Sequence, residues 1–236
     1  MKILILTLWC LIPLGLLAFH YGPGRTGLAL DETSEIIAVA ENHAASENWK
    51  DAIESYELAL SKLPKDRVAE ARPIRLAIAK ARMQSNGLPK AREELAALTA
   101  ELEADPKADP ALRDGALAEL ATARFYMTYL MKLEGLPETE WEPEIEAARQ
   151  ERKLLVSRAT ESGDTKSAAL HADDLEAAIR LARTDPADLY GKPIPKECSA
   201  CKSGKCSNPK PSAKPGKKPK DSRGASSGAP IDGAGS

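Results

Sequence analysis

Three cysteines near the carboxyl end have the spacing closest to that of a chemical site. Cys198, Cys201 and Cys206 form the pattern C-x2-C-x4-C in a segment rich in proline and lysine. Two thiolates separated by two residues can bind one zinc ion, but a structural zinc site takes four ligands. The chain has three histidines, and none lies near this pattern. A zinc site here would therefore need a fourth ligand from a second chain or from another protein.

A disulfide is the simpler chemistry for these cysteines if the segment is exported, because disulfides persist in oxidising compartments. Such a bond would join two of the three thiols and leave the third for a bond to another molecule. We therefore expect a disulfide or an intermolecular crosslink first, a metal site second and redox catalysis third. The fourth cysteine, Cys10, lies in an apolar segment and is expected to serve as a small apolar residue.

The sequence contains none of the common catalytic patterns. There is no H-E-x-x-H, no G-x-S-x-G and no Walker A loop, and "SGDTKS" lacks the glycine spacing that a phosphate loop needs. Carboxylates are abundant, but those four residues from Lys or Arg on a helix are typical of solvated ion pairs. The sequence predicts a non-enzymatic protein with no cofactor, apart from the possible zinc at the cysteines.

The charge of the chain is divided unevenly along its length. Residues 190–236 carry ten Lys and Arg against three Asp and Glu, so this tail has a net charge of +7 and residues 1–189 have −9. A basic tail behind an acidic body is typical of an interacting or solvating segment. The body offers no basic stripe, so no specific nucleic-acid partner is expected. Salt-sensitive binding of the tail to an anionic polymer, lipid or nucleic acid remains an alternative.

The amino-terminal segment is apolar enough to be a membrane anchor. Residues 3–19 contain no charge and, as a helix, would span roughly 26 Å, the low end for a hydrocarbon core of about 30 Å. We expect residues 1–21 to form an uncleaved signal anchor in a bacterial inner membrane. The positive charge of Lys2 favours a body on the exported, periplasmic side. Secretion after cleavage near residues 27–29 is the alternative.

Between residues 33 and 184, apolar residues recur at helical spacing and are separated by Gly, Pro and Asn. Asn86-Gly87 is expected to end one helix with a left-handed cap. The pattern predicts an all-α domain over residues 33–184, with a linker at 22–32 and a disordered tail at 185–236. The predicted helices, three pairs and a final capping helix, cover about 33–46, 49–63, 68–85, 89–104, 110–133, 141–162 and 165–183.

One stretch, "ENWKDAIESYELALSKLP", alternates large rings with small alanines. Antiparallel helices pack closely only where small residues let their backbones approach. The stretch resembles the second helix of a tetratricopeptide repeat, and a weaker copy follows after 39 residues instead of the usual 34 or so. We place the extra five residues in the linker after Pro64. Arg82 and Thr99 depart from the pattern, and Ala121 is the possible small residue of a third repeat. The repeat-defining residues are Ala40, Trp49, Ala52, Tyr56, Ala59, Pro64, Ala79 and Ala91.

The resemblance implies an α-solenoid with a concave groove, lined by the first helix of each pair, that binds a peptide or a partner helix. Two adjacent rings on one helix are not expected to face the same core, so either Phe125 or Tyr126 should be exposed as an anchor. A carboxylate clamp is not matched, because Ile37 and Glu41 occupy positions where it needs Lys and Asn. The residues expected in the groove are Glu41, Lys80, Met83, Gln84, Phe125 and Tyr126.

Together these features predict a membrane-anchored adaptor that binds a membrane-associated protein partner through its repeats. The layout of one amino-terminal span, few repeats and a charged tail resembles the repeat subunits of the Bat aerotolerance systems. Those subunits accompany von Willebrand A-domain membrane proteins. Two alternatives remain open at this point: an ordinary helical bundle, and a thiol- or metal-handling protein whose working part is the C-x2-C-x4-C tail.

The state of the three tail cysteines can be measured directly. In protein purified without reductant, mass spectrometry with thiol counting should find two of Cys198, Cys201 and Cys206 in a disulfide. Elemental analysis should find no stoichiometric zinc. Three free thiols together with bound zinc would contradict this prediction and favour the metal-handling alternative.

Overall fold

The computed structural model describes residue 12 and residues 23–190, and over these residues the protein is all-α, as predicted. None of the described residues forms a strand. The predicted anchor at 1–21, apart from Ile12, and the three tail cysteines lie outside the described residues. The helices are α2 (Pro23–Ala45), α3 (Trp49–Lys62), α4 (Val68–Met83), α5 (Leu88–Ala104), α6 (Pro110–Leu133), α7 (Glu138–Glu161), α8 (Thr165–Arg183) and α9 (Pro186–Leu189).

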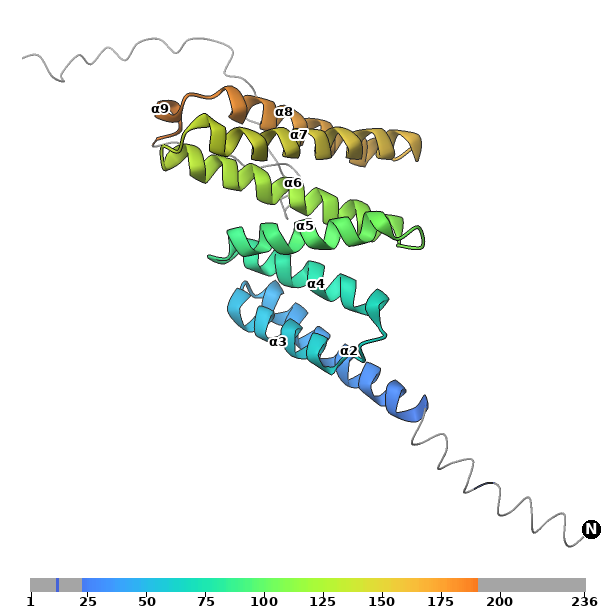
Figure 1. Cartoon of the computed structure of the whole chain (residues 1–236). Coiled ribbons are helices and arrows are strands. Elements are labelled where there is room, and N and C mark those ends of the chain that lie inside the picture. The colour runs from blue at the N-terminus through green and yellow to red at the C-terminus, as the bar shows by residue number, and fades with distance from the viewer. Residues whose placement is uncertain (1–11, 13–22, 191–236) are drawn as a thin grey trace, which may run out of the picture. The chain divides into compact units, whose positions relative to one another are not determined.

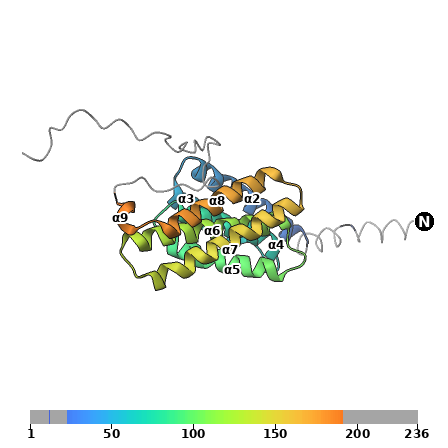
Figure 2. The same cartoon turned by 90° about the horizontal axis from the view of Figure 1, so that it is seen from above.

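The long helices pack in chain order, each mainly against the helix before it and the helix after it (Figure 1). Successive helices run in opposite directions and form layers from α2 and α3 to α7 and α8. Figure 2 shows these layers from above, lying over one another. Two further contacts join elements that are not neighbours in the chain, α4 with α6 and α6 with α9. The described helices therefore form a serial array and not a bundle around one central core.

The predicted small residues lie where consecutive helices meet. Ala40 of α2 and Ala52 of α3 are both fully buried and belong to one cluster with Tyr56. Ile74 and Ile78 of α4 complete this cluster, so α4 covers the apolar side chains of the α2–α3 pair. Further along the chain, the other alanines singled out from the sequence are also buried: Ala59, Ala79, Ala91 and Ala121. Trp49 and Pro64 are half-buried.

The core is divided into several small clusters along the array. The largest lies where α6, α7, α8 and α9 meet, around Phe125, Tyr129, Trp141 and Ile145. Smaller clusters join α4, α5 and α6, around Leu95 and Leu120 and around Leu98 and Leu102. Each interface is thus stabilised by its own apolar contacts, as expected when repeated helix pairs stack.

The predicted cap at Asn86-Gly87 is wrong in its geometry. Gly87 has φ −106°, which is not left-handed, and it precedes the first residue of α5. Its backbone N–H donates to the carbonyl of Arg82 at 3.2 Å. A Cβ at residue 87 would lie 3.2 Å from the Arg82 Cβ, so the glycine permits a close approach. Among residues 23–190, the glycines with left-handed backbone are Gly135 and Gly163, which follow α6 and α7.

Two predicted boundaries also require correction. Helix α2 begins at Pro23, ten residues before the predicted start, so much of the expected linker is helical. Pro23 suits a first turn, and Gly24 and Gly27 each cost only about 1 kcal/mol relative to alanine, which does not end the helix. At the other end, the structure continues beyond residue 184 through α9. Leu189 is buried in the α6–α8 cluster, and the Tyr190 hydroxyl donates to the Leu133 carbonyl at 2.9 Å.

Among the described residues, no helix is both long enough and apolar enough to cross a membrane.

Overpacking tests the close approach of the helices at alanine. Ala91 is fully buried in α5, whereas Ala97 of the same helix is exposed. Ala91→Leu should lower the free energy of unfolding by about 1–3 kcal/mol, because the added methyl groups force the helices apart. The control Ala97→Leu should change it by less than about 0.5 kcal/mol. Urea denaturation followed by circular dichroism measures both, and equal effects would contradict the close approach.

Candidate functional site

Three of the predicted groove residues are exposed on the first helices of their pairs. They are Glu41 on α2, Lys80 on α4, and Gln84, which caps the carboxyl end of α4. The Lys80 ammonium lies 3.0 Å from the Glu119 carboxylate of α6. This ion pair spans the two first helices that contact each other directly. Met83 is half-buried and packs against the α4–α6 core.

The prediction that either Phe125 or Tyr126 is an exposed anchor is wrong. Phe125 is fully buried, and Tyr126 packs against the same cluster with its ring edge-to-face on Phe125 at 5.4 Å. Successive helical residues differ by about 100° in direction, but the cluster around this part of α6 receives side chains from α7, α8 and α9. Its buried face is therefore wide enough for both rings. Phe125 is not part of an accessible groove.

A buried charge cluster between α5, α6 and α7 was not predicted. We call Arg92, Arg124, Glu144 and Glu151 the α5–α7 charge cluster. The Arg124 Nη1 lies 2.9 Å from Glu144, and its Nε lies 3.0 Å from Glu151. Arg92 reaches from α5 to the same Glu144 carboxylate. The sequence had suggested solvated pairs within single helices, whereas these pairs join different helices.

Glu151 is the member of this cluster whose proton affinity is most altered. Burial raises the pKa of its carboxyl to about 7, although Arg124 opposes the shift. Only 15% of the Glu151 side chain is exposed. Buried carboxyl groups with raised pKa values are frequent at functional sites, and they also occur in structural ion-pair networks. Here the ion-pair partner is Arg124 of the neighbouring helix α6, which favours a structural role.

A second polar group joins α6, α7 and α8 around Arg152. The Arg152 side chain is fully buried, and its Nη2 donates to the Thr122 hydroxyl at 2.7 Å. Its Nη1 lies 3.3 Å from the buried Asp174 carboxylate and 3.3 Å from the Nδ1 of His171. Arg152 thus contacts both of the helices that neighbour α7.

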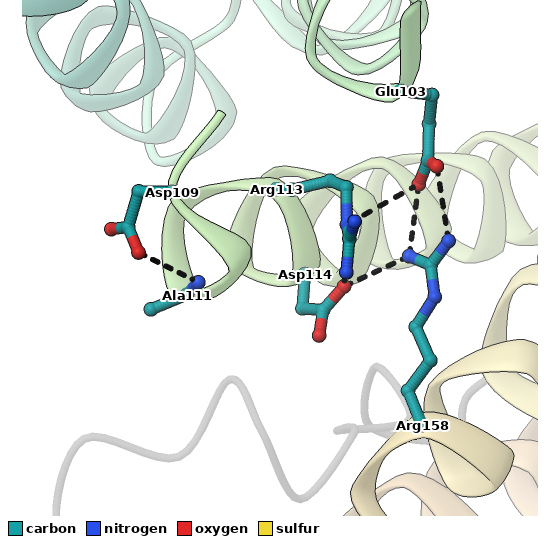
Figure 3. Close-up of polar contacts among 6 residues, drawn as sticks. All are labelled: Glu103, Asp109, Ala111, Arg113, Asp114 and Arg158. Atoms are coloured by element: carbon teal, nitrogen blue, oxygen red, sulfur yellow. Dashed lines mark hydrogen bonds and ion pairs between the residues drawn. The ribbon is translucent and has the colours of Figure 1, made fainter. Parts of the chain in front are cut away.

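A third network, drawn in Figure 3, joins α5, α6 and α7. Arg158 of α7 makes a two-point contact with Glu103 of α5 at 2.9 and 3.0 Å, and it reaches Asp114 of α6 at 2.8 Å. Arg113 joins the same two carboxylates. The Arg158 hydrogen bonds lower the pKa of Glu103. Nearby, Asp109 caps α6 by accepting from the Ala111 N–H at 3.2 Å.

Lys132 holds the carboxyl end of α8 in place. Its ammonium donates to the carbonyls of Leu181 at 3.1 Å and Ala182 at 3.0 Å, and it lies 3.9 Å from the ring centroid of Trp141. A cation at a helix carboxyl end satisfies free carbonyls and the helix dipole. Desolvation lowers the pKa of Lys132, and the charges of Glu138 and Asp185 oppose this shift.

One sequence signal could have revealed the buried arginine. On α7, Trp141, Ile145, Ala148, Leu155 and Ala159 form one apolar stripe at helical spacing, and Arg152 falls within it. A charge inside an apolar stripe indicates a buried, partnered group. Glu144 and Glu151 lie beside the stripe and give a weaker signal.

These groups join helices and do not form a recognisable reaction centre. Every buried cation described above lies against a carboxylate, a hydroxyl or a carbonyl of another helix. Within residues 23–190, no three His, Cys, Asp or Glu side chains are grouped so as to hold a metal ion. The chemistry that the described residues support best is the fixing of helix positions.

The raised pKa of Glu151 can be tested by measuring how the free energy of unfolding changes with pH. Its folded-state pKa is raised, so the folded protein binds more protons than the unfolded chain between about pH 4.5 and 7. The free energy of unfolding of the wild type, relative to Glu151→Gln, should therefore fall as the pH rises through this range. The total fall should be at most about 3 kcal/mol.

Glu146→Gln is the matched control for this measurement, because Glu146 is a solvent-exposed carboxyl on the same helix. This variant should keep the pH dependence of the wild type. A stability difference between wild type and Glu151→Gln that rises with pH would show that the attraction of Arg124, and not burial, dominates at Glu151. Urea denaturation at a series of pH values measures all three proteins.

Comparisons with known proteins find no matching family model and no similar curated protein for this chain.

Proposed function

We propose that this chain is a membrane-anchored, non-enzymatic scaffold built as a tetratricopeptide-like α-solenoid. In this proposal, residues 1–21 anchor it in a bacterial inner membrane and the helical array lies on the exported side. The inner face of the array, formed by α2, α4, α6 and α8, binds a peptide or a helix of a membrane-associated protein. The partner-binding residues are Glu41, Lys80 and Gln84, with the half-buried Met83 beside them.

The observation that carries the proposal is the serial packing of the helices. Each described helix contacts mainly its neighbours in the chain. The faces of the array are therefore not buried in a common core. Stacked helix pairs of this kind typically bind their partners on an extended face. The buried alanines at the positions of the repeat pattern support the same reading.

The difference between the two sides of the array supports the choice of inner face. On one side, α4 and α6 contact each other directly. On the other side, α5 and α7 are joined by long arginine side chains, from Arg92 to Glu144 and from Arg158 to Glu103. A closer approach of the first helices than of the second helices bends a stack toward the first helices. Lys80 and Gln84, exposed on α4, lie on that side.

Site-specific photocrosslinking in native membranes tests the proposed inner face. A photoreactive residue at position 80 or 84 should crosslink to one defined protein, identified by mass spectrometry. The same probe at the exposed positions Lys90 and Glu93 of α5 should give only background. Equal crosslinking from both faces, or none from the inner face, would contradict the proposal.

A charge exchange separates binding from stability. The double variant Lys80→Glu/Glu119→Lys keeps an ion pair between α4 and α6 but reverses the charges that a partner meets. With the photoreactive residue at position 84, we expect crosslinking to fall about tenfold or more, a change of about 1.4 kcal/mol in binding, with the thermal unfolding temperature retained. Changing Cys198, Cys201 and Cys206 to Ser should leave the crosslink unchanged. The thiol-handling alternative predicts the opposite: the charge exchange would leave the crosslink unchanged, and the cysteine changes would abolish it.

A further inference from the structure

Helix α8 is attached to the array by two different kinds of contact. Its carboxyl half supplies Ala177, Ala178, Leu181 and Ala182 to the apolar cluster with α6 and α7, and Lys132 binds its last carbonyls. The preceding residues, 165–176, contribute nothing to that cluster. Their apolar side chains Leu170 and Leu175 are only half-buried, whereas Asp174 is fully buried. Asp174, the partner of Arg152, is therefore the one fully buried side chain of residues 165–176.

The contact between Arg152 and His171 fixes the protonation state of the histidine. The Arg152 Nη1 lies 3.3 Å from the His171 Nδ1. A guanidinium has donors only, so the Nδ1 must accept and must carry its lone pair. The proton of the neutral ring then lies on Nε2. A proton on Nδ1 would remove the acceptor and place a second positive charge beside a buried arginine.

The carboxylates around His171 are already engaged by other groups. Asp174, on α8 itself, pairs with Arg152. Asp164, at the start of α8, accepts from the backbone N–H and the hydroxyl of Ser167. Asp114 on α6 is bound by Arg158 of α7.

Burial and the charge of Arg152 together outweigh the attraction of these three carboxylates for a proton. The pKa of His171 is accordingly lowered. The closed position of α8 therefore disfavours protonation of the ring, and an open position restores its ordinary proton affinity. By linkage, acid favours opening.

We propose that His171 and Arg152 form an acid-sensitive latch, in which protonation of His171 releases residues 165–176 of α8 while residues 177–183 stay docked. Segments with few buried apolar contacts are the ones that open locally below the global unfolding energy. Release uncovers the part of α7 around Arg152 and the Thr122 hydroxyl of α6. The latch depends only on the contacts of α6, α7 and α8, and not on the partner-binding function proposed above.

Hydrogen exchange of the full-length protein, read by mass spectrometry on peptides from α8, tests the latch. After correction for intrinsic exchange rates, protection of residues 165–176 should fall by up to about tenfold between pH 7.5 and 5.5, the limit set by an ordinary histidine pKa near 6.5. Protection of residues 177–183 should stay constant. An equal loss in both halves would indicate unfolding of the whole helix and would overturn the proposal, as would constant protection in both.

Two variants test whether protonation of His171 is the event that releases residues 165–176. In His171→Asn the side-chain oxygen can still accept from Arg152 but cannot titrate, so the protection of residues 165–176 should no longer depend on pH. The control His43→Asn, in the half-buried last turn of α2, should keep the pH dependence of the wild type. A pH dependence that persists in His171→Asn would overturn the proposal.

The protonation state can also be read in the unaltered protein, so the test does not depend on any variant folding. Nitrogen-15 NMR at pH 7.5 should show His171 with an unprotonated Nδ1 and a proton on Nε2. A proton on Nδ1 at this pH would exclude the hydrogen bond from Arg152 and therefore the latch.

Discussion

The structure depends on one constraint, that consecutive helices must form a stable interface without help from a common core. In a serial array, each helix buries one side against the preceding helix and another side against the next. Each interface between consecutive helices therefore buries a limited apolar area. A close approach of the two backbones increases the apolar contact within that area. The buried alanines permit this approach, since a larger side chain at Ala52 or Ala91 would separate the helices.

Because the interfaces bury little apolar area, charged side chains provide additional contacts between the helices. Arginines and lysines cross nearly every helix junction, as in Lys62 with Glu32, Arg72 with Glu101 and Arg158 with Glu103. Exposed pairs such as Lys62 with Glu32 add little stability individually, because water screens them and the side chains lose freedom. The buried ones are different, since removal of either partner leaves a charge without compensation. Arg152 and Lys132 are of this second kind, and both fix α8.

This division gives the array a graded stability along its length. The junction of α6 with α7, which contains Phe125, Trp141 and the α5–α7 charge cluster, combines apolar and ionic contacts. In the amino half of α8, by contrast, the one fully buried side chain is Asp174, which pairs with Arg152. If the proposed latch and scaffold are correct, residues 165–176 would open in acid while the proposed partner-binding face stays in place.

The sequence by itself determined the helices and the places where they approach. The spacing of apolar residues, together with the Gly, Pro and Asn residues between them, located the seven long helices. The alanines of the repeat pattern are buried as expected. Both features depend on local spacing in the sequence. The start of α2 and the addition of α9 were missed, since Gly27 did not end the helix and Leu189 gains its burial only from α6 to α8.

Only the tertiary structure decided which side chains share an environment. Phe125 and Tyr126 could share one core because α7, α8 and α9 all contribute side chains to it. Arg152 could be buried because its partners come from α6 and α8. Such partners lie roughly 20 to 50 residues apart, so no local spacing relates them. Proximity across a fold, and the pKa values that follow from it, are properties of the assembled helices.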